Sequence, residues 1–520
     1  MKKWNAVLAL CGTLALAHAQ KPNWHNLDLQ RDSVFGISTE KAYNELLKNK
    51  KSTPVVVAVI DSGIDTAHED LRSVLWVNPK EKAGNQKDDD KNRYTDDING
   101  WSFIGSEKGN VQYDNLELTR ILRKQMARFG SLSSLPEDTT GLYAFQQLKS
   151  EYDRELAKAK MQLMGMTQFA AALDSVVVHA NKGRLTLEDL KGYKAANGQE
   201  RHVKTILMKE LQRYPDAVTF KEKEIDGGVE HFKDMVEYQL NLEYDPRAVV
   251  GDDYNNVKER YYGSNDVTGP DADHGTHVAG IIGAVRNNGL GIEGVADNVQ
   301  IMVVRAVPNG DERDKDIANA IRYAVDKGAK VINMSFGKPY SPDKKVVDEA
   351  VKYALKKDVL LIHAAGNEGL NIDDSANIFY PRRQYEKKGE ANAWIEVGAS
   401  GYKDDETLVA SFSNYGKNTV DVFAPGVSIY SSVPGSKYTY HDGTSMASPV
   451  VAGLAALIRS YYPKLSAMEV KDIILQSAVK VTHPVMVADG GAPHAVQLSD
   501  ICRTGAVVNA YAALQLAAQK

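Results

Sequence analysis

Three short motifs, far apart in the chain, carry the residue types that nucleophilic catalysis needs. Asp61 follows the apolar run 55–60, His274 stands in Asp-His-Gly-Thr-His, and Ser445 stands in Gly-Thr-Ser-Met-Ala-Ser-Pro. A serine hydroxyl becomes a nucleophile when a histidine takes its proton and a carboxylate orients that histidine. Each motif alone is commonly a turn or a helix cap. Together they indicate an acyl-transfer site.

A fourth motif offers the group that stabilises negative charge in such a reaction. Asn367 follows Ala-Ala-Gly after the apolar run 359–362 and could aim its amide into a cleft, although a plain turn is the alternative. The order Asp, His, Ser is that of subtilisin-type sites, and no Gly-x-Ser-x-Gly elbow of a lipase or esterase surrounds Ser445. Jointly, the motifs resemble those of the subtilisin-like serine proteases (subtilases, peptidase family S8).

This resemblance implies a role for each residue. Ser445 would attack the scissile carbonyl, His274 would move the proton, and Asp61 would orient His274. The Asn367 side chain and the backbone N–H of Ser445 would form the oxyanion hole. Two segments would pair with extended peptides or unfolded proteins through backbone bonds; they comprise Ser335, Phe336, Gly337, Ala364, Ala365 and Gly366. The alternative is a catalytically inactive peptide-binding or adaptor protein with the same fold.

The elements that must position these residues follow from the hydrophobic pattern. Short runs of β-branched and aliphatic residues predict buried strands at 55–60, 301–304, 331–334, 359–362 and 420–423. Helical patterns lie between them, and this alternation predicts an α/β fold with a parallel sheet. The resemblance implies, more specifically, a three-layer subtilisin-like fold with a parallel β-sheet flanked by helices.

Residues 106–249 differ from this pattern. They contain no strand-like run, and apolar residues between 145 and 173 recur at spacings of three and four, which predicts a long helix. The stretch therefore reads as an α-helical insertion between a first catalytic segment, residues 20–105, and a second, residues 250–520. It explains why 213 residues separate Asp61 from His274, where compact subtilases have a few tens. The insertion could restrict substrate access, recruit a partner or only stabilise the fold.

The N-terminus predicts export. Lys2 and Lys3 precede an apolar run over residues 6–17 and the small-x-small sequence Ala17, His18, Ala19, which is the layout of a signal peptide over residues 1–19. We therefore expect an extracytoplasmic protein, secreted or periplasmic. Residues 33–47 already resemble the start of a mature subtilase domain, so we also expect folding without a separate propeptide.

Composition excludes several classes of function. Of the 520 residues, 43% are hydrophobic and 25% charged, which is typical of a globular protein. The net charge of −5 provides no basic field, so no nucleic-acid partner is expected. Outside the signal peptide no apolar stretch approaches about 18 residues, so no transmembrane segment is expected. Nothing in the sequence specifies an oligomeric state.

Calcium is the one cofactor that the sequence suggests, and no organic cofactor is expected. The resemblance places Asp70 and Asn288 at a structural calcium site, and a solvated turn is the alternative for the loop around Asn288. A second acidic loop also resembles a calcium loop, but Arg93 stands where a glycine is wanted, which favours a solvated turn. Its side chains are Asp88, Asp90, Asn92 and Asp96. No zinc pattern is present, because His274 and His277 lack a third ligand.

Overall fold

The computed structural model describes residues 21–130, 140–488 and 491–520. The predicted signal peptide, residues 1–19, therefore lies outside the described residues. The chain divides into two compact units. The larger consists of residues 22–156 and 234–520, and the smaller contains residues 157–233.

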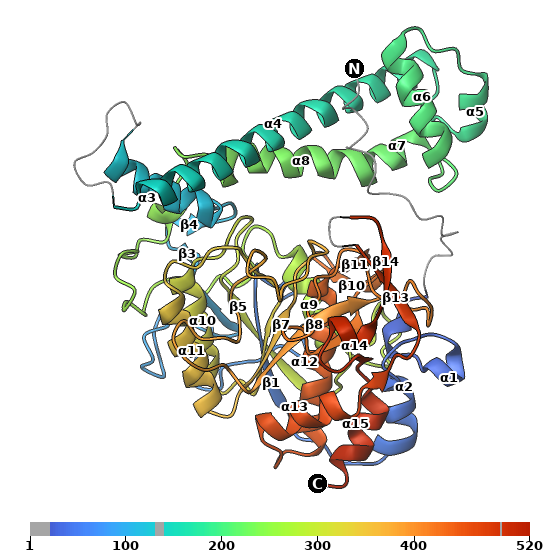
Figure 1. Cartoon of the computed structure of the whole chain (residues 1–520). Helices are drawn as coiled ribbons and strands as arrows, with labels where there is room; N and C mark the ends of the chain where they lie inside the picture. The colour runs from blue at the N-terminus through green and yellow to red at the C-terminus, as the bar shows by residue number, and fades with distance from the viewer. Residues whose placement is uncertain (1–20, 131–139, 489–490) are drawn as a thin grey trace. The chain divides into compact units, whose positions relative to one another are not determined.

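A nine-stranded sheet forms the centre of the larger unit (Figure 1). Its strands are parallel, except that β12 runs antiparallel to β15. In spatial order they are β12 (Val479–Lys480), β15 (Ala506–Val507), β9 (Val422–Pro425), β8 (Trp394–Ser400), β7 (Leu360–Ala364), β6 (Val331–Met334), β1 (Val55–Asp61), β5 (Val299–Arg305) and β2 (Gly100–Ser102).

Both faces of this sheet are buried. Successive residues of a strand point to opposite faces, and in β1 the side chains of Val57 and Val59 join one core cluster while Ala58 and Ile60 join another. The first cluster is covered by α9 (Asp273–Gly283), α12 (Thr444–Tyr461), α13 (Ala467–Gln476) and α15 (Ala510–Ala517). The second is covered by α10 (Asp314–Asp326) and α11 (Lys344–Lys356). The predicted three-layer α/β fold is thus confirmed.

Short elements complete the larger unit. Three two-stranded sheets pair β3 (Gly105–Ser106) with β4 (Gly109–Asn110), β10 (Ile429–Val433) with β11 (Lys437–His441), and β13 (Pro484–Val487) with β14 (His494–Gln497). Three helices of four residues each are α1 (Leu29–Asp32), α2 (Thr39–Ala42) and α14 (Leu498–Ile501). The five predicted strands all exist, but the last begins two residues later than the apolar run suggests, as β9.

Helices dominate the predicted insertion, as the sequence pattern indicates. They are α3 (Glu117–Phe129), α4 (Leu142–His179), α5 (Leu187–Gly192), α6 (Gly198–Glu210), α7 (Ala217–Phe220) and α8 (Gly227–Asp234). Residues 157–233 have a core of their own, to which α4, α5, α6 and α7 contribute buried side chains such as Leu173, Leu190, Leu207 and Phe220. Two segments on either side of the smaller unit in the sequence, residues 111–129 and 234–262, belong to the larger unit. We call them the insertion stem.

Helix α4 is long and apolar enough, by length and composition, to cross a membrane, and it is the one described helix that passes this test. Core helices of soluble proteins and signal sequences pass the same test, so a single case is weak evidence. The expected absence of a transmembrane segment stays a prediction.

Candidate active site

Asp61 and His274 come from different elements and meet directly. Asp61 is the last residue of β1, and His274 is the second residue of α9. The His274 Nδ1 atom lies 2.7 Å from Asp61 Oδ1, which also accepts a 2.8 Å hydrogen bond from the Ser62 N–H. Asp61 is buried, and its Oδ2 atom has no hydrogen-bond partner among the described residues. The Asp61 carboxylate is therefore placed to fix the tautomer of His274. The Nε2 atom of His274 is then the ring nitrogen that can exchange a proton with another group.

The surroundings of His274 make it a stronger base than a free histidine. Burial by itself lowers the pKa of His274, because it disfavours the charged imidazolium. The negative charge of Asp61 and its hydrogen bond act in the opposite direction, with smaller contributions from Asp273 and Asp271. The net effect is a pKa of His274 above its usual value.

Ser445 lies in the first turn of α12, which packs against α9. Its hydroxyl donates a 3.3 Å hydrogen bond to the Ser335 carbonyl, and the Ser335 hydroxyl donates in return to the Ser445 carbonyl at 3.0 Å. Within the described residues Ser445 makes no hydrogen bond to His274. Such bonds are often long or misaligned without substrate and tighten in the substrate complex. The contact between Ser445 and His274 that the predicted triad requires stays a prediction.

Asn367 is held by the residue that precedes Ser445. Its Oδ1 atom accepts hydrogen bonds from the Thr444 N–H at 2.8 Å and from the Thr444 hydroxyl at 3.0 Å. The Thr444 hydroxyl also accepts from the Gly366 N–H at 3.1 Å. Because the amide oxygen is occupied in this way, the Asn367 NH₂ group remains available as a donor. The sequence analysis identified Asn367 but not Thr444, whose place beside Ser445 could have suggested such a role.

The predicted peptide-binding segments follow two neighbouring strands. Ser335, Phe336 and Gly337 follow β6; Ala364 ends β7 and is followed by Ala365 and Gly366. Because β6 and β7 are parallel neighbours, both segments leave the same edge of the sheet. The Phe336 side chain is partly exposed and Gly337 is exposed, while Ser335, Ala364 and Ala365 are buried.

A buried histidine, missed by the sequence analysis, connects these two segments. His363 lies in β7, and its Nε2 atom is 2.9 Å from the Phe336 carbonyl oxygen. Its Nδ1 atom is 2.7 Å from Glu396 Oε1, and Glu396 accepts a further hydrogen bond from Trp394 Nε1 at 2.8 Å. The His363 side chain, from the strand that precedes the second segment, thus contacts the backbone of the first segment. The signal in the sequence was a histidine inside an otherwise apolar run.

The structure brings Asp70 and Asn288 together, as expected for the first calcium site. However, Asn288 directs its amide nitrogen toward Asp70, with Nδ2 2.7 Å from Oδ1, and the Tyr438 hydroxyl lies 3.4 Å from Asp70 Oδ2. Burial raises the pKa of Asp70, and these donors partly offset that effect. Calcium takes oxygen ligands, and here hydrogen-bond donors face the carboxylate. The set fits a calcium ion only after Asn288 turns its oxygen inward, and the site stays a prediction.

In the second acidic loop, the candidate metal ligands share only Asp90 with those of the sequence pattern. Glu81, Asp90 and Asp97 each offer a carboxylate oxygen, and these oxygens lie within 4.8 Å of one another, so the group could hold a metal ion. The Lys327 ammonium is 2.9 Å from Asp90 and 2.8 Å from Asp97. The Lys327 ammonium thus already provides these two carboxylates with the positive charge that a metal ion would supply.

The other predicted side chains of that loop cap turns. Asp88 accepts from the backbone of Asn92 and Arg93, Asn92 accepts from Tyr94, and Asp96 accepts from Gln86. Arg93 adopts a positive φ of 75°, so the turn forms without the glycine that a calcium loop prefers. The solvated-turn alternative accounts for these contacts.

Serine proteases are among the known proteins to which the chain is similar. The chain is 44% identical over 210 residues to a thermophilic serine proteinase of Bacillus sp. (strain AK1), a match that covers 40% of this chain and 47% of that protein. It is 38% identical over 209 residues to subtilisin DY of Bacillus licheniformis, covering 40% and 71%. A solved structure of a protease from Pseudoalteromonas arctica matches with a TM-score of 0.40 and 29% identity, covering 49% of this chain and 79% of that one.

The matches cover only part of these curated relatives. The chain spans about half the length of the first curated relatives it matches. Similarity to them therefore identifies a shared domain rather than a whole protein. The sequence model of the Subtilase family matches residues 52–498, which include β1, α9, β7 and α12 with the four predicted catalytic side chains. The chain belongs to the subtilase family.

Proposed function

We propose that the protein is a secreted serine endopeptidase that hydrolyses peptide bonds through Asp61, His274 and Ser445. The observation that carries the proposal is the 2.7 Å contact between His274 Nδ1 and a buried Asp61 carboxylate, in a chain of the subtilase family. Without a catalytic partner, burying this carboxylate with one oxygen unpaired would only cost stability.

The proposed reaction assigns a role to each of these groups. The Ser445 Oγ forms a bond to the scissile carbonyl carbon while His274 Nε2 takes the hydroxyl proton. The carbonyl oxygen becomes an oxyanion, which the Asn367 NH₂ group and the Ser445 N–H stabilise. His274 then gives its proton to the leaving amine as the C–N bond breaks. Water next forms a bond to the acyl carbon while His274 takes its proton, and the bond from that carbon to Ser445 Oγ breaks as His274 returns the proton to Ser445. Asp61 stays ionised and stabilises the imidazolium.

Extended peptides are the substrates that the two binding segments fit. Residues 335–337 and 364–366 leave one edge of the sheet side by side, and an extended peptide could add as a strand between them. Backbone pairing of this kind selects for extended or unfolded chains more than for sequence. We further propose an extracytoplasmic location; one relative, 39% identical over 232 residues, is named a cell wall-associated protease of Bacillus subtilis.

A structural calcium ion belongs to the proposal as well, with Asp70 and Asn288, or Glu81, Asp90 and Asp97, as its side-chain ligands. Such an ion would add a positive charge that holds surface loops together. It takes no part in the proposed reaction.

The experiment is active-site labelling with a fluorophosphonate probe, followed by a casein digest. We expect the wild type to label and to cleave casein, Ser445→Ala to do neither, and Ser411→Ala, which changes an exposed serine, to behave like the wild type. If folded wild-type protein neither labels nor cleaves, with or without calcium, the enzyme proposal is wrong. Casein binding without cleavage would then support the alternative of an inactive peptide-binding protein.

A further inference from the structure

Lys338, the residue after the first binding segment, is held from two sides. Its backbone N–H donates to the Tyr380 carbonyl at 2.9 Å, and its own carbonyl accepts from the Tyr380 N–H at 2.8 Å. Its side chain is 2% exposed, and its ammonium lies 2.8 Å from Glu117 Oε2 and 2.9 Å from Asp314 Oδ1. The ammonium also donates to the Glu312 carbonyl at 2.6 Å. Three acceptors thus fix a buried cation at the end of the segment.

Glu117 belongs to the insertion stem. It is the first residue of α3, and its N–H donates to Asp311 Oδ2 at 2.7 Å. Its carboxylate also pairs with Arg120 at 2.5 Å, one turn further along the helix. Lys338 and Arg120 keep the pKa of Glu117 at about 2, although burial opposes this. The insertion therefore contributes a charged, buried partner to the residue that ends the binding segment.

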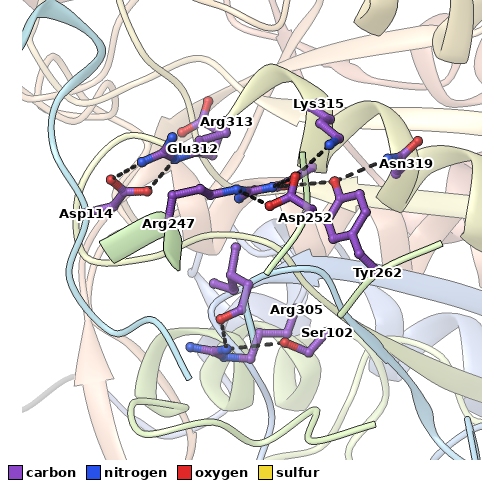
Figure 2. Close-up of polar contacts among 12 residues, drawn as sticks. Ser102, Asp114, Arg247, Asp252, Tyr262, Arg305, Glu312, Arg313, Lys315 and Asn319 are labelled. Carbon is purple, nitrogen blue, oxygen red and sulfur yellow. Dashed lines mark hydrogen bonds and ion pairs between the residues drawn. The ribbon is translucent and has the colours of Figure 1, made fainter. Parts of the chain in front are cut away.

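The rest of the stem is anchored to the same region of the catalytic unit. Arg313, in the segment before α10, bonds both carboxylate oxygens of Asp114 at 2.7 and 2.9 Å (Figure 2). On the returning side of the stem, Arg247 bonds both oxygens of Asp316 at 2.6 and 2.8 Å. Because both sides of the stem are fixed by buried ion pairs, the position of Glu117 is set by the stem as a whole.

We propose that Glu117 and Lys338 form a positioning pair, through which the insertion stem sets the backbone of residues 335–337 and so the affinity for extended peptides. This inference rests on the proposed peptide-binding role of residues 335–337. Neither side chain touches the reacting atoms, so both act as positioning residues rather than catalytic ones.

The physical argument is that a strand-pairing site tolerates little displacement. Hydrogen bonds weaken steeply as their angle and length depart from the optimum, and a shift of about 1 Å in a binding geometry can cost about 100-fold in rate. The segment is supported at three points: by Ser445 at Ser335, by His363 at Phe336, and at Lys338 by Glu117 together with Asp314, the Glu312 carbonyl and the backbone of Tyr380. The third acts at the end of the segment that is further along the chain from Ser335, the residue that contacts Ser445, so its loss should affect the distant part of a long substrate most.

The test separates long from short substrates. We would compare acetyl-Ala-Ala-Ala-Leu p-nitroanilide with acetyl-Leu p-nitroanilide in the wild type, Glu117→Gln, Lys338→Met and the double variant, each at a concentration titrated with the fluorophosphonate probe. We expect KM for the long substrate to rise about tenfold in each variant, with kcat and the short-substrate KM within about twofold. The double variant should be no worse than the worse single variant.

The matched control is Asp153→Asn, which removes an exposed ion pair with Lys149, 2.6 Å apart, elsewhere in the insertion. It should change neither substrate's KM. Glu117→Gln keeps the shape of the side chain, so it remains informative if Lys338→Met does not fold. Equal effects on both substrates, or no effect on either, would overturn the positioning role.

A binding measurement keeps this inference separate from the proposed activity. In the Ser445→Ala background, fluorescein-labelled β-casein should bind about tenfold more weakly when Glu117→Gln is added, as measured by fluorescence anisotropy. This result is expected whether or not the wild type is catalytic. If the wild type hydrolyses peptides but Glu117→Gln leaves casein affinity unchanged, the positioning pair is wrong while the proposed function stands.

Discussion

The active site and the insertion stem both bury charged side chains, and they differ in how completely those charges are paired. In the active site the His274 side chain is 40% exposed, and Asp61 has an oxygen without a partner among the described residues. In the stem, the Arg247 side chain is 9% exposed and contacts two carboxylates, Asp252 and Asp316.

This difference indicates that buried charge has a different role in each region. A buried charge that lacks partners costs free energy, and such groups concentrate where a reaction needs them. A buried charge with a full set of partners fixes the position of the chain, even when the pair adds little net stability. Substitutions in the active site should therefore change activity more than stability, and those in the stem should do the opposite.

Replacing Asp61 with Asn should give the largest effect. The amide favours the wrong tautomer of His274 and cannot stabilise the imidazolium, so kcat should fall about 10⁴-fold, as expected for a catalytic triad. Because Asn has nearly the same shape, Tm should change by only a few degrees. Hydrolysis rates at a titrated enzyme concentration and thermal unfolding would measure both quantities. The comparison between the regions fails if unfolding accounts for the lost activity.

Arg247→Met tests the opposite half of the comparison. It leaves Asp316 and Asp252 without their main partner, and breaking a buried ion pair from one side costs about 3–5 kcal/mol. The kcat for acetyl-Leu p-nitroanilide, per titrated active site, should stay within about twofold of the wild type. Denaturant unfolding measures the stability, with Arg260→Met as the control, because the Arg260 side chain forms an exposed 3.4 Å ion pair with Asp326. A cost below about 1 kcal/mol, the range of a surface pair, would show that the stem is not anchored by this arginine.

The same contrast explains how much of the structure could be predicted. The prediction of the strands and of Asp61 depends on local patterns. Five apolar runs are sufficient to locate the strands, and a motif at a strand end is sufficient to identify Asp61. The partners of Lys338 and Arg247 depend on packing, since Glu117 and Asp316 lie 221 and 69 residues away in the sequence. Nothing local indicates which lysine is buried. For the same reason β2, β12 and β15, which have two or three residues each, left no hydrophobic signal.

The acidic loop shows where a family pattern is insufficient. The pattern selected Asp88, Asp90, Asn92 and Asp96. Of these, Asp90 belongs to the clustered carboxylates, together with Glu81 and Asp97, whereas the other three cap turns. Spacing along the chain identifies an acidic loop. It does not identify which oxygens converge, because that depends on the path of the backbone.

Glu312→Gln should have a smaller effect, confined to one range of pH. Burial raises the pKa of Glu312 to about 8, opposed by the charge of Lys338, and its Oε1 atom has no partner among the described residues. In the unfolded chain the pKa is about 4.5. Between these values only the unfolded state releases the proton, so this residue makes stability fall as pH rises from about 4.5 to about 8.

The variant removes that dependence. Thermal unfolding of Glu312→Gln should match the wild type near pH 4.5 and show a higher Tm at pH 8, with a gain on the order of 1–3 kcal/mol. Glu243→Gln, at an exposed position, is the control and should show no such trend. A wild type and variant whose difference in stability does not grow with pH would show that Glu312 is ionised in the folded protein.

The smallest effect concerns the charge beside the proposed base. His274 must be neutral to accept a proton, and its pKa is raised, so kcat/KM of the wild type should fall with decreasing pH around a midpoint above about 6.5. Asp273 contributes to that rise and also pairs with His441 at 2.8 Å. Asp273→Asn should therefore move the midpoint to lower pH by a few tenths of a unit, and less in high salt.

The control for this shift is Asp404→Asn. Asp404 is 2.9 Å from His483, and the exposures of the two side chains, 43% and 32%, resemble the 49% and 33% of Asp273 and His441. Among the described residues, Asp61, His274 and Ser445 form no hydrogen bond or ion pair with Asp404 or His483, so removing that pair should leave the midpoint of the pH profile unchanged. If both variants move the midpoint equally, the change reflects net charge and not the field at His274. If Asp273→Asn alone shifts the midpoint, a single partly exposed neighbour is sufficient to change the pKa of His274. The active site would then differ from the stem, where several buried partners surround each charge.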